Sequence, residues 1–119
     1  MGYVKVRVKI SNIEKLEKFK ELDLIVDTGA IYTVISRRIL EELEIKPIGK
    51  RRFKLANGEV IEREVGICRI DYKDLFTHSI VVFGEETDMQ ILGVTTLEEL
   101  GLQVDPVSGE LKPMELLLL

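Results

Sequence analysis

The sequence has little of the chemistry on which disulfides, metal sites and thiol catalysis depend. Its 119 residues include one cysteine, Cys68, one histidine, His78, and no tryptophan. A single cysteine cannot form a disulfide within the chain, which favours a reducing compartment, and we expect a cytoplasmic protein. Zinc sites need several ligands together, and a catalytic thiol needs a neighbouring base. We therefore expect no metal and no cofactor, and we interpret Cys68 as a buried structural thiol.

Charge and hydropathy argue against two further classes of partner. Seventeen Lys and Arg residues are spread among twenty-one Asp and Glu residues, which gives a net charge of -4. Nucleic-acid-binding domains gather basic residues on one face, whereas the one basic run here, Lys50–Arg52, is interpreted as a solvated loop. The apolar run Leu116–Leu119 is too short to cross a bilayer, and the charged first residues are unlike a signal peptide. We expect neither nucleic acid nor a membrane as a partner.

Apolar residues recur mostly with the period of β-strands. Val4, Val6, Val8 and Ile10 alternate with basic residues, which is typical of a strand with one buried face. Further strands are expected at residues 16–26, 31–35, 53–55, 59–72, 76–83, 89–92, 102–104 and 110–113. Asn57-Gly58 and Lys73-Asp74 are expected to form hairpin turns.

Two short helices are expected between these strands. Ser36 is placed to cap the first. Thr95 with Glu98, or Thr96 with Glu99, could form a capping box for the second, which Gly101 would end in a left-handed conformation. The pattern predicts one domain, residues 1–119, with an all-β, barrel-like fold.

Asp27 is the residue whose position most needs an explanation. It follows an apolar stretch, Leu24–Val26, that is expected to be buried, where an acid is costly unless it is hydrogen-bonded or performs chemistry. Gly29 lets the chain turn sharply and lets backbone N–H groups approach the carboxylate, and the hydroxyl of Thr28 can donate and accept. Because Asp-Thr-Gly is also a common turn sequence, the tripeptide alone does not decide between a catalytic acid and a simple turn.

The residues around this tripeptide carry a family resemblance. Leu24–Ala30 resembles the active-site loop of retropepsin-like (clan AA) aspartic proteases. Downstream, Ile91-Leu92-Gly93, followed by a short helix, is similar to the second hallmark of that family. The resemblance covers roughly residues 4–112 and is closest to the small stand-alone microbial members, here with a single Asp-Thr-Gly-Ala motif. It implies a closed acid-protease barrel.

The resemblance also implies how the site would be assembled. An aspartic protease needs two carboxyl groups that share a proton, one to activate water and one to polarise the peptide carbonyl. The chain has one Asp-Thr-Gly and no second equivalent, so a two-fold homodimer would have to bring Asp27 and its copy together. Thr28 would brace the dyad across the interface, Gly29 and Ala30 would complete the loop, and Ile91-Leu92-Gly93 would support it.

Two other segments receive roles from the same resemblance. Residues Ala56, Asn57, Gly58 and Glu59 would form the flap that closes over an extended peptide substrate. A plain hairpin loop is an equally good interpretation, since the segment has less glycine than viral flaps. Tyr3–Ile10 and Glu110–Leu119 would be terminal strands that interleave in the dimer, with a disordered tail as the alternative for Leu116–Leu119.

The sequence thus favours an aspartic endopeptidase that uses an Asp27 dyad, needs no metal and works best on the acidic side of neutral. The first alternative is a non-catalytic dimeric module that binds peptides, or only dimerises, on the same fold. A second is a phosphate-handling enzyme of the sugar-kinase or actin-like type, which also has Asp-x-Gly turns after strands but needs a larger, two-lobed chain. A third is a structural β-domain in which the turn has no function.

Overall fold

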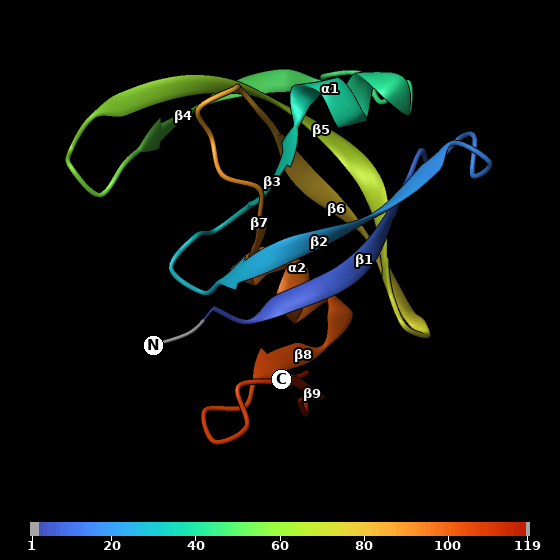
Figure 1. Ribbon diagram of the computed structural model, residues 1–119, viewed down its shortest axis with the longest axis vertical. Helices are drawn as coiled ribbons and strands as arrows, with labels where there is room; N and C mark the ends of the chain where they lie inside the picture. Colours follow the sequence, from blue (N-terminus) through green and yellow to red (C-terminus); the bar gives the residue numbers. More distant parts are fainter. Residues whose placement is uncertain (1–2, 119) are drawn as a thin grey trace.

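Strands closed into a small barrel form the body of the molecule (Figure 1). The computed structural model describes residues 3–118. Within them the strands are β1 (Lys5–Ser11), β2 (Phe19–Asp27), β3 (Thr33–Ser36), β4 (Gly49–Lys54), β5 (Val60–Tyr72), β6 (Leu75–Gly84), β7 (Ile91–Gly93), β8 (Leu102–Val104) and β9 (Leu111–Pro113). The helices are α1 (Arg37–Glu42) and α2 (Val94–Leu100).

Six of the strands form a closed circuit. Their order is β1-β2-β7-β3-β6-β5, and β5 returns to β1 through pairs such as Ile10 with Ile70. Strand β4 pairs with the outer part of β5 and forms with it the long hairpin at the upper left of Figure 1. Strands β8 and β9 make a separate two-stranded sheet. The predicted all-β retropepsin-like barrel with two short helices is confirmed.

The core fills the barrel with aliphatic side chains. Val6, Val8 and Ile10 of β1 point inward and are buried, as their alternation predicts. Cys68 is fully buried among them, and burial raises the pKa of its thiol to about 12, so the thiol stays protonated and unreactive at neutral pH. Its interpretation as a structural residue is confirmed. Other fully buried members of the core are Ile35, Leu40, Ile70, Val81, Phe83 and Leu92.

The basic run Lys50–Arg52 was wrongly interpreted as a loop, because it lies in β4. The antiparallel register sets Lys50 opposite Glu64 and Arg52 opposite Glu62. Opposite charges facing each other across a strand pair are stabilising. Within the described residues Lys50 lies 3.9 Å from Glu62, while Arg51 faces the like-charged Arg63. The strand is therefore held mainly by its backbone pairing with β5, which a reading of β4 alone does not reveal.

Both helices begin without the side-chain caps that the sequence predicts. Ser36 does lie at the N-cap of α1, but its side chain makes no capping hydrogen bond. Helix α2 begins after Gly93, so neither predicted capping box forms. The first N–H groups of α2 are satisfied by the loop after β2 instead, as described below. Gly101 ends α2 in the left-handed conformation, with φ 74°, as predicted.

Strand boundaries and chain ends also differ from the expectations. β2 begins at Phe19 rather than at residue 16, and β7 begins at Ile91 because Met89 is exposed in the preceding connection. The N-terminal segment is already part of the barrel as β1. Leu116–Leu118 are exposed and outside any strand, and Leu119 lies outside the described residues. That the two ends interleave in a dimer stays a prediction.

A chain of buried hydroxyl groups fastens α2 to the barrel. Thr96 Oγ1 lies 2.6 Å from Thr33 Oγ1 and 2.9 Å from Ser79 Oγ. Thr33 Oγ1 also accepts the N–H of Gly93 at 3.0 Å. All three hydroxyl-bearing side chains are buried. Thr96, at the centre, therefore links α2 to β3 and β6. Thr33 extends this hydrogen-bond network to β7.

We predict that Thr96→Val destabilises the fold by about 1–3 kcal/mol, because it leaves two buried hydroxyl groups short of a partner without changing the side-chain shape. Urea unfolding followed by circular dichroism measures the difference. Thr95→Val is the matched control on the same helix, where a change below about 0.5 kcal/mol is expected. Equal stability of the Thr96→Val protein and the wild type would contradict the assigned role.

Candidate functional site

Asp27 ends β2 directly beside the second motif. Strands β2 and β7 run parallel, and their register sets Val26 opposite Leu92 and Asp27 opposite Gly93. Two segments that are far apart in the sequence therefore form one structural unit in the middle of the barrel (Figure 1). The predicted active-site loop and the predicted hallmark are brought together.

The turn after β2 folds back on the Asp27 carboxylate. The N–H of Gly29 donates to Asp27 Oδ1 at 2.9 Å, and the N–H of Ala30 donates to the Asp27 carbonyl at 3.1 Å. A Cβ on residue 29 would stand only 3.2 Å from that carboxylate oxygen, so glycine suits the close approach. Asp27, Thr28 and Gly29 are all exposed in the single chain. The carboxylate is thus oriented by the turn and open to solvent.

Gly93 and α2 pack against the loop that carries Asp27 and hold it in place. A Cβ on Gly93 would lie 2.4 Å from the carbonyl carbon of Tyr32, a distance that no real contact reaches. The N–H groups of Val94 and Thr95 donate to the carbonyls of Ala30 and Ile31 at 2.8 and 3.0 Å. The first turn of α2 leaves N–H groups without partners inside the helix, and the loop supplies their acceptors. The sequence hallmark therefore acts as a backbone clamp on the loop that carries Asp27.

A cavity of about 830 Å³ opens beside Asp27. In Figure 1 the β4–β5 hairpin and the turn after β2 extend from the same side of the barrel, with the β6–β7 connection between them. The cavity is bounded by these three segments. Its apolar lining includes Ile31, Tyr32, Val34, Phe53, Leu55, Ile61, Met89 and Ile91.

The β4–β5 hairpin forms as predicted, with Gly58 at φ 89°. The N–H of Leu55 donates to the carbonyl of Glu59 at 2.8 Å, and the Asn57 side chain accepts the N–H of Glu59 at 2.8 Å. Ala56, Asn57, Gly58 and Glu59 are exposed, and none of these four lines the cavity. The tip residues named from the sequence thus lie outside the lining of the cavity.

The hairpin contacts the cavity through its strands, which the sequence analysis did not identify. Phe53 and Leu55 line it from one arm and Ile61 from the other. The Phe53 ring packs edge-on against Tyr32 with centroids 6.1 Å apart. The period-two spacing of Arg51, Phe53 and Leu55 was the signal that could have predicted one shared face.

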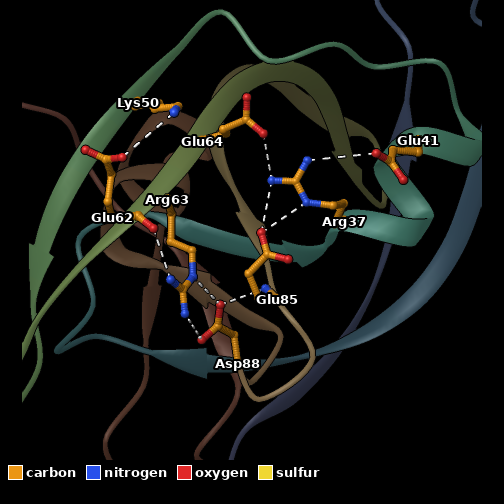
Figure 2. A network of polar contacts seen from close by, with 8 residues as sticks. All are labelled: Arg37, Glu41, Lys50, Glu62, Arg63, Glu64, Glu85 and Asp88. Atoms are coloured by element: carbon orange, nitrogen blue, oxygen red, sulfur yellow. Dashed lines mark hydrogen bonds and ion pairs between the residues drawn. The ribbon is translucent and has the colours of Figure 1, made fainter.

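An ion pair fixes the β6–β7 connection against the hairpin (Figure 2). Arg63 on β5 binds Asp88 through two bonds, Nε to Oδ2 at 2.7 Å and Nη2 to Oδ1 at 3.1 Å. The same Oδ2 accepts the N–H of Glu85 at 2.7 Å. The Arg63 hydrogen bond lowers the pKa of Asp88 below its ordinary value of 3.8. Asp88 lines the cavity, so this pair positions part of the cleft wall.

A second arginine joins α1 to the same region. Arg37 Nη2 lies 2.8 Å from Glu64 on β5 and 3.0 Å from Glu85 after β6, and both contacts appear in Figure 2. Arg37 also lies within 3.8 Å of Glu41 on its own helix. The pKa of Arg37 is raised, first of all by its hydrogen bond to Glu85. The two arginines together tie the base of the hairpin to the barrel.

Metal and membrane sites are not evident in the described chain. Among residues 3–118, no cluster of three or more His, Cys, Asp or Glu side chains is arranged to hold a metal ion. Within the same residues, no helix has the length and apolar character needed to cross a bilayer.

Comparison with known proteins supplies a family match. A family model described as "gag-polyprotein putative aspartyl protease" matches residues 17–99, well over half of the chain. The matched span includes the Asp27–Ala30 loop, the β4–β5 hairpin and the Ile91–Gly93 strand. No curated protein matches the chain.

We predict that Gly93→Ala destabilises the fold by about 2–3 kcal/mol, because a methyl group there must displace the backbone of Tyr32. Thermal and urea unfolding measure the loss. Gly49→Ala is the matched control, since nothing lies within 4 Å of a Cβ at that position. A Gly93→Ala protein as stable as the Gly49→Ala protein would disprove the close packing of loop and strand.

The lowered pKa of Asp88 predicts a pH-dependent contribution to stability. A carboxyl group whose pKa is lower in the folded state stabilises the fold above its unfolded pKa, and the contribution is lost as pH falls through the folded value. The stability difference between wild type and Asp88→Asn should therefore be largest above about pH 5 and shrink below about pH 4. Urea unfolding across this range tests it, and a constant difference would count against the Arg63–Asp88 pair as its source.

Proposed function

Because the chain belongs to the retropepsin-like aspartyl protease family, we propose that it is an aspartic endopeptidase that acts as a homodimer. The observation that carries the proposal is the Asp27 carboxylate, oriented by its turn and exposed at the edge of a large, mainly apolar cavity. A peptide bond lying in that cavity would pass beside the carboxylate. Among residues 3–118 Asp27 is the acid that the turn presents in this way, and the chemistry requires two.

The second carboxyl group is expected from a second copy of the chain. Asp88 is the other acid that lines the cavity, but both of its oxygens are bound by Arg63. A carboxylate held in this way as an anion is poorly suited to sharing a proton with Asp27. Two-fold symmetry would place Asp27 of the partner opposite Asp27 without any further requirement.

The dimer would hydrolyse a peptide bond by acid–base catalysis. Two carboxyl groups at hydrogen-bonding distance share one proton, since both cannot ionise comfortably there. The ionised group takes a proton from the attacking water, and the protonated group polarises the peptide carbonyl. The resulting tetrahedral intermediate collapses when the amine leaves with a proton. No covalent bond to the enzyme forms, and we propose that Thr28 braces the loops across the interface.

The walls of the cavity suit an extended peptide. The β4–β5 hairpin would cover the peptide as a flap, with Phe53 and Leu55 contacting it from above. Alternate side chains of an extended chain point the same way and would enter pockets lined by residues such as Ile31 and Ile91. Apolar side chains beside the scissile bond are therefore favoured.

We predict that the purified protein cleaves a mixed peptide library between about pH 4 and 7, and that Asp27→Asn lowers the rate at least about 100-fold. Mass spectrometry of the products measures cleavage, and sedimentation shows whether the variant is still a dimer. Asp23→Asn on the same strand is the matched control and should cleave like the wild type. Because one carboxyl must stay protonated, activity should fall toward alkaline pH.

Two results would count against this function. Cleavage that survives in a dimeric Asp27→Asn protein would remove Asp27 from the chemistry. Peptide binding without cleavage by a dimeric wild type would instead support the non-catalytic peptide-binding module on the same fold.

A further inference from the structure

Arg51 lies on the cavity side of the hairpin, close to the ring of Tyr32. It lines the same cavity as Asp27 and Phe53. Its Nη1 donates a hydrogen bond to the Tyr32 hydroxyl, and its guanidinium carbon lies 5.2 Å from the centre of the Tyr32 ring. A cation over an aromatic face is held there by the ring quadrupole. The guanidinium is thus positioned at the wall of the cleft.

The positive charge of Arg51 is not neutralised by the described part of the chain. Residues 3–118 provide no ion-pair partner for it, although the neighbouring Lys50 lies 3.9 Å from Glu62. The residue directly opposite Arg51 on β5 is Arg63, and like charges that face each other across strands repel. Arg63 is compensated by Asp88, and Arg51 has no equivalent acid.

Most of the hydrogen-bonding capacity of Arg51 is also unused by protein groups. A guanidinium has five N–H donors, and the Tyr32 hydroxyl accepts from one nitrogen, Nη1. The cavity surface as a whole is largely apolar, with Phe53 and Leu55 on the strand face of Arg51, although Arg52, Lys54 and Arg63 also line it. A peptide that fills the cleft would strip water from these donors, and donors left unpaired in a closed cleft oppose binding.

We propose that Arg51 is a specificity-determining residue that selects peptides with a carboxylate side chain, Asp or Glu, in the subsite formed by Arg51 and Tyr32. The inference rests on the proposed function, because it names the substrate class of that cleft. The planar guanidinium matches a carboxylate through two parallel hydrogen bonds. An amide of the same size offers no charge, and a lysine in the subsite would be repelled. In an extended peptide one side chain would face this wall in each copy of the dimer, so two acidic positions related by the two-fold axis should be favoured.

The test uses a series of peptides in which one Glu is moved along an apolar background, each with a matched Gln and a matched Lys peptide. Fluorescence anisotropy with labelled peptides gives Kd in the Asp27→Asn protein, which cannot cleave them, and wild-type kcat/KM is measured on the same series. At the position that faces Arg51 of either copy, the Glu peptide should bind about tenfold more tightly than its Gln match, and the Lys peptide more weakly than either. The preference should decrease with added salt.

Arg51→Gln, in the same background, should reduce the Glu-over-Gln preference to less than about twofold, and Arg51→Glu should favour the Lys peptide. Lys50→Gln is the matched control. It removes one positive charge from the same strand at a residue outside the cavity lining, so the preference should remain. The unfolding temperature of each variant shows that binding is compared between folded proteins.

The outcomes separate this inference from the proposed function. A Glu preference that Arg51→Gln abolishes, with no peptide cleaved by the wild type, would support the subsite and overturn the endopeptidase. Cleavage or binding that is equal for Glu and Gln at every position would overturn the role of Arg51 while leaving the endopeptidase intact. A preference that persists in Arg51→Gln, or no binding of any peptide, would also overturn it.

Discussion

The parallel pairing of β2 with β7 is the constraint on which the site depends. It sets Asp27 beside Gly93. Because Gly93 has no side chain, the backbone at Tyr32 can pack directly against the backbone of Gly93. The N–H groups that begin α2 then hold the loop through the carbonyls of Ala30 and Ile31. A side chain at Gly93 would push the loop that carries Asp27 away from β7 and α2, and the backbone that orients the Asp27 carboxylate would shift. Fold and site are therefore coupled at one strand pair.

Ion pairs hold the elements that form the cleft beside this strand pair. Arg63 binds Asp88 in the β6–β7 connection, and Arg37 bridges Glu64 and Glu85 (Figure 2). These partly exposed pairs fix the base of the hairpin, whereas its tip projects freely. Such a division between a held base and a free tip suits a cover that must admit an extended peptide. In the proposed dimer a second copy of the chain would build the far half of the cleft.

Local patterns in the sequence predicted much of this arrangement. Period-two alternation identified β1, Asn57-Gly58 identified the hairpin, and Gly101 identified the end of α2, because each reflects a short-range preference. The predictions that were wrong concern features that depend on contacts with residues far away in the sequence. β4 forms by backbone pairing with β5, a partner that the residues of β4 do not reveal. The first N–H groups of α2 donate to backbone carbonyls of a remote loop rather than to its own threonines. The packing of Tyr32 against Phe53 likewise depends on tertiary contacts, although the period-two spacing of Arg51, Phe53 and Leu55 indicates that these three share one face.

Mixing wild-type and Asp27→Asn chains tests most directly whether catalysis requires Asp27 from both copies of the chain. At constant total protein, chains that exchange freely should give activity proportional to the square of the wild-type fraction. An equal mixture would then retain about one quarter of the wild-type activity. Activity that falls linearly, to about one half in the equal mixture, would show that each chain works alone and would contradict the shared dyad.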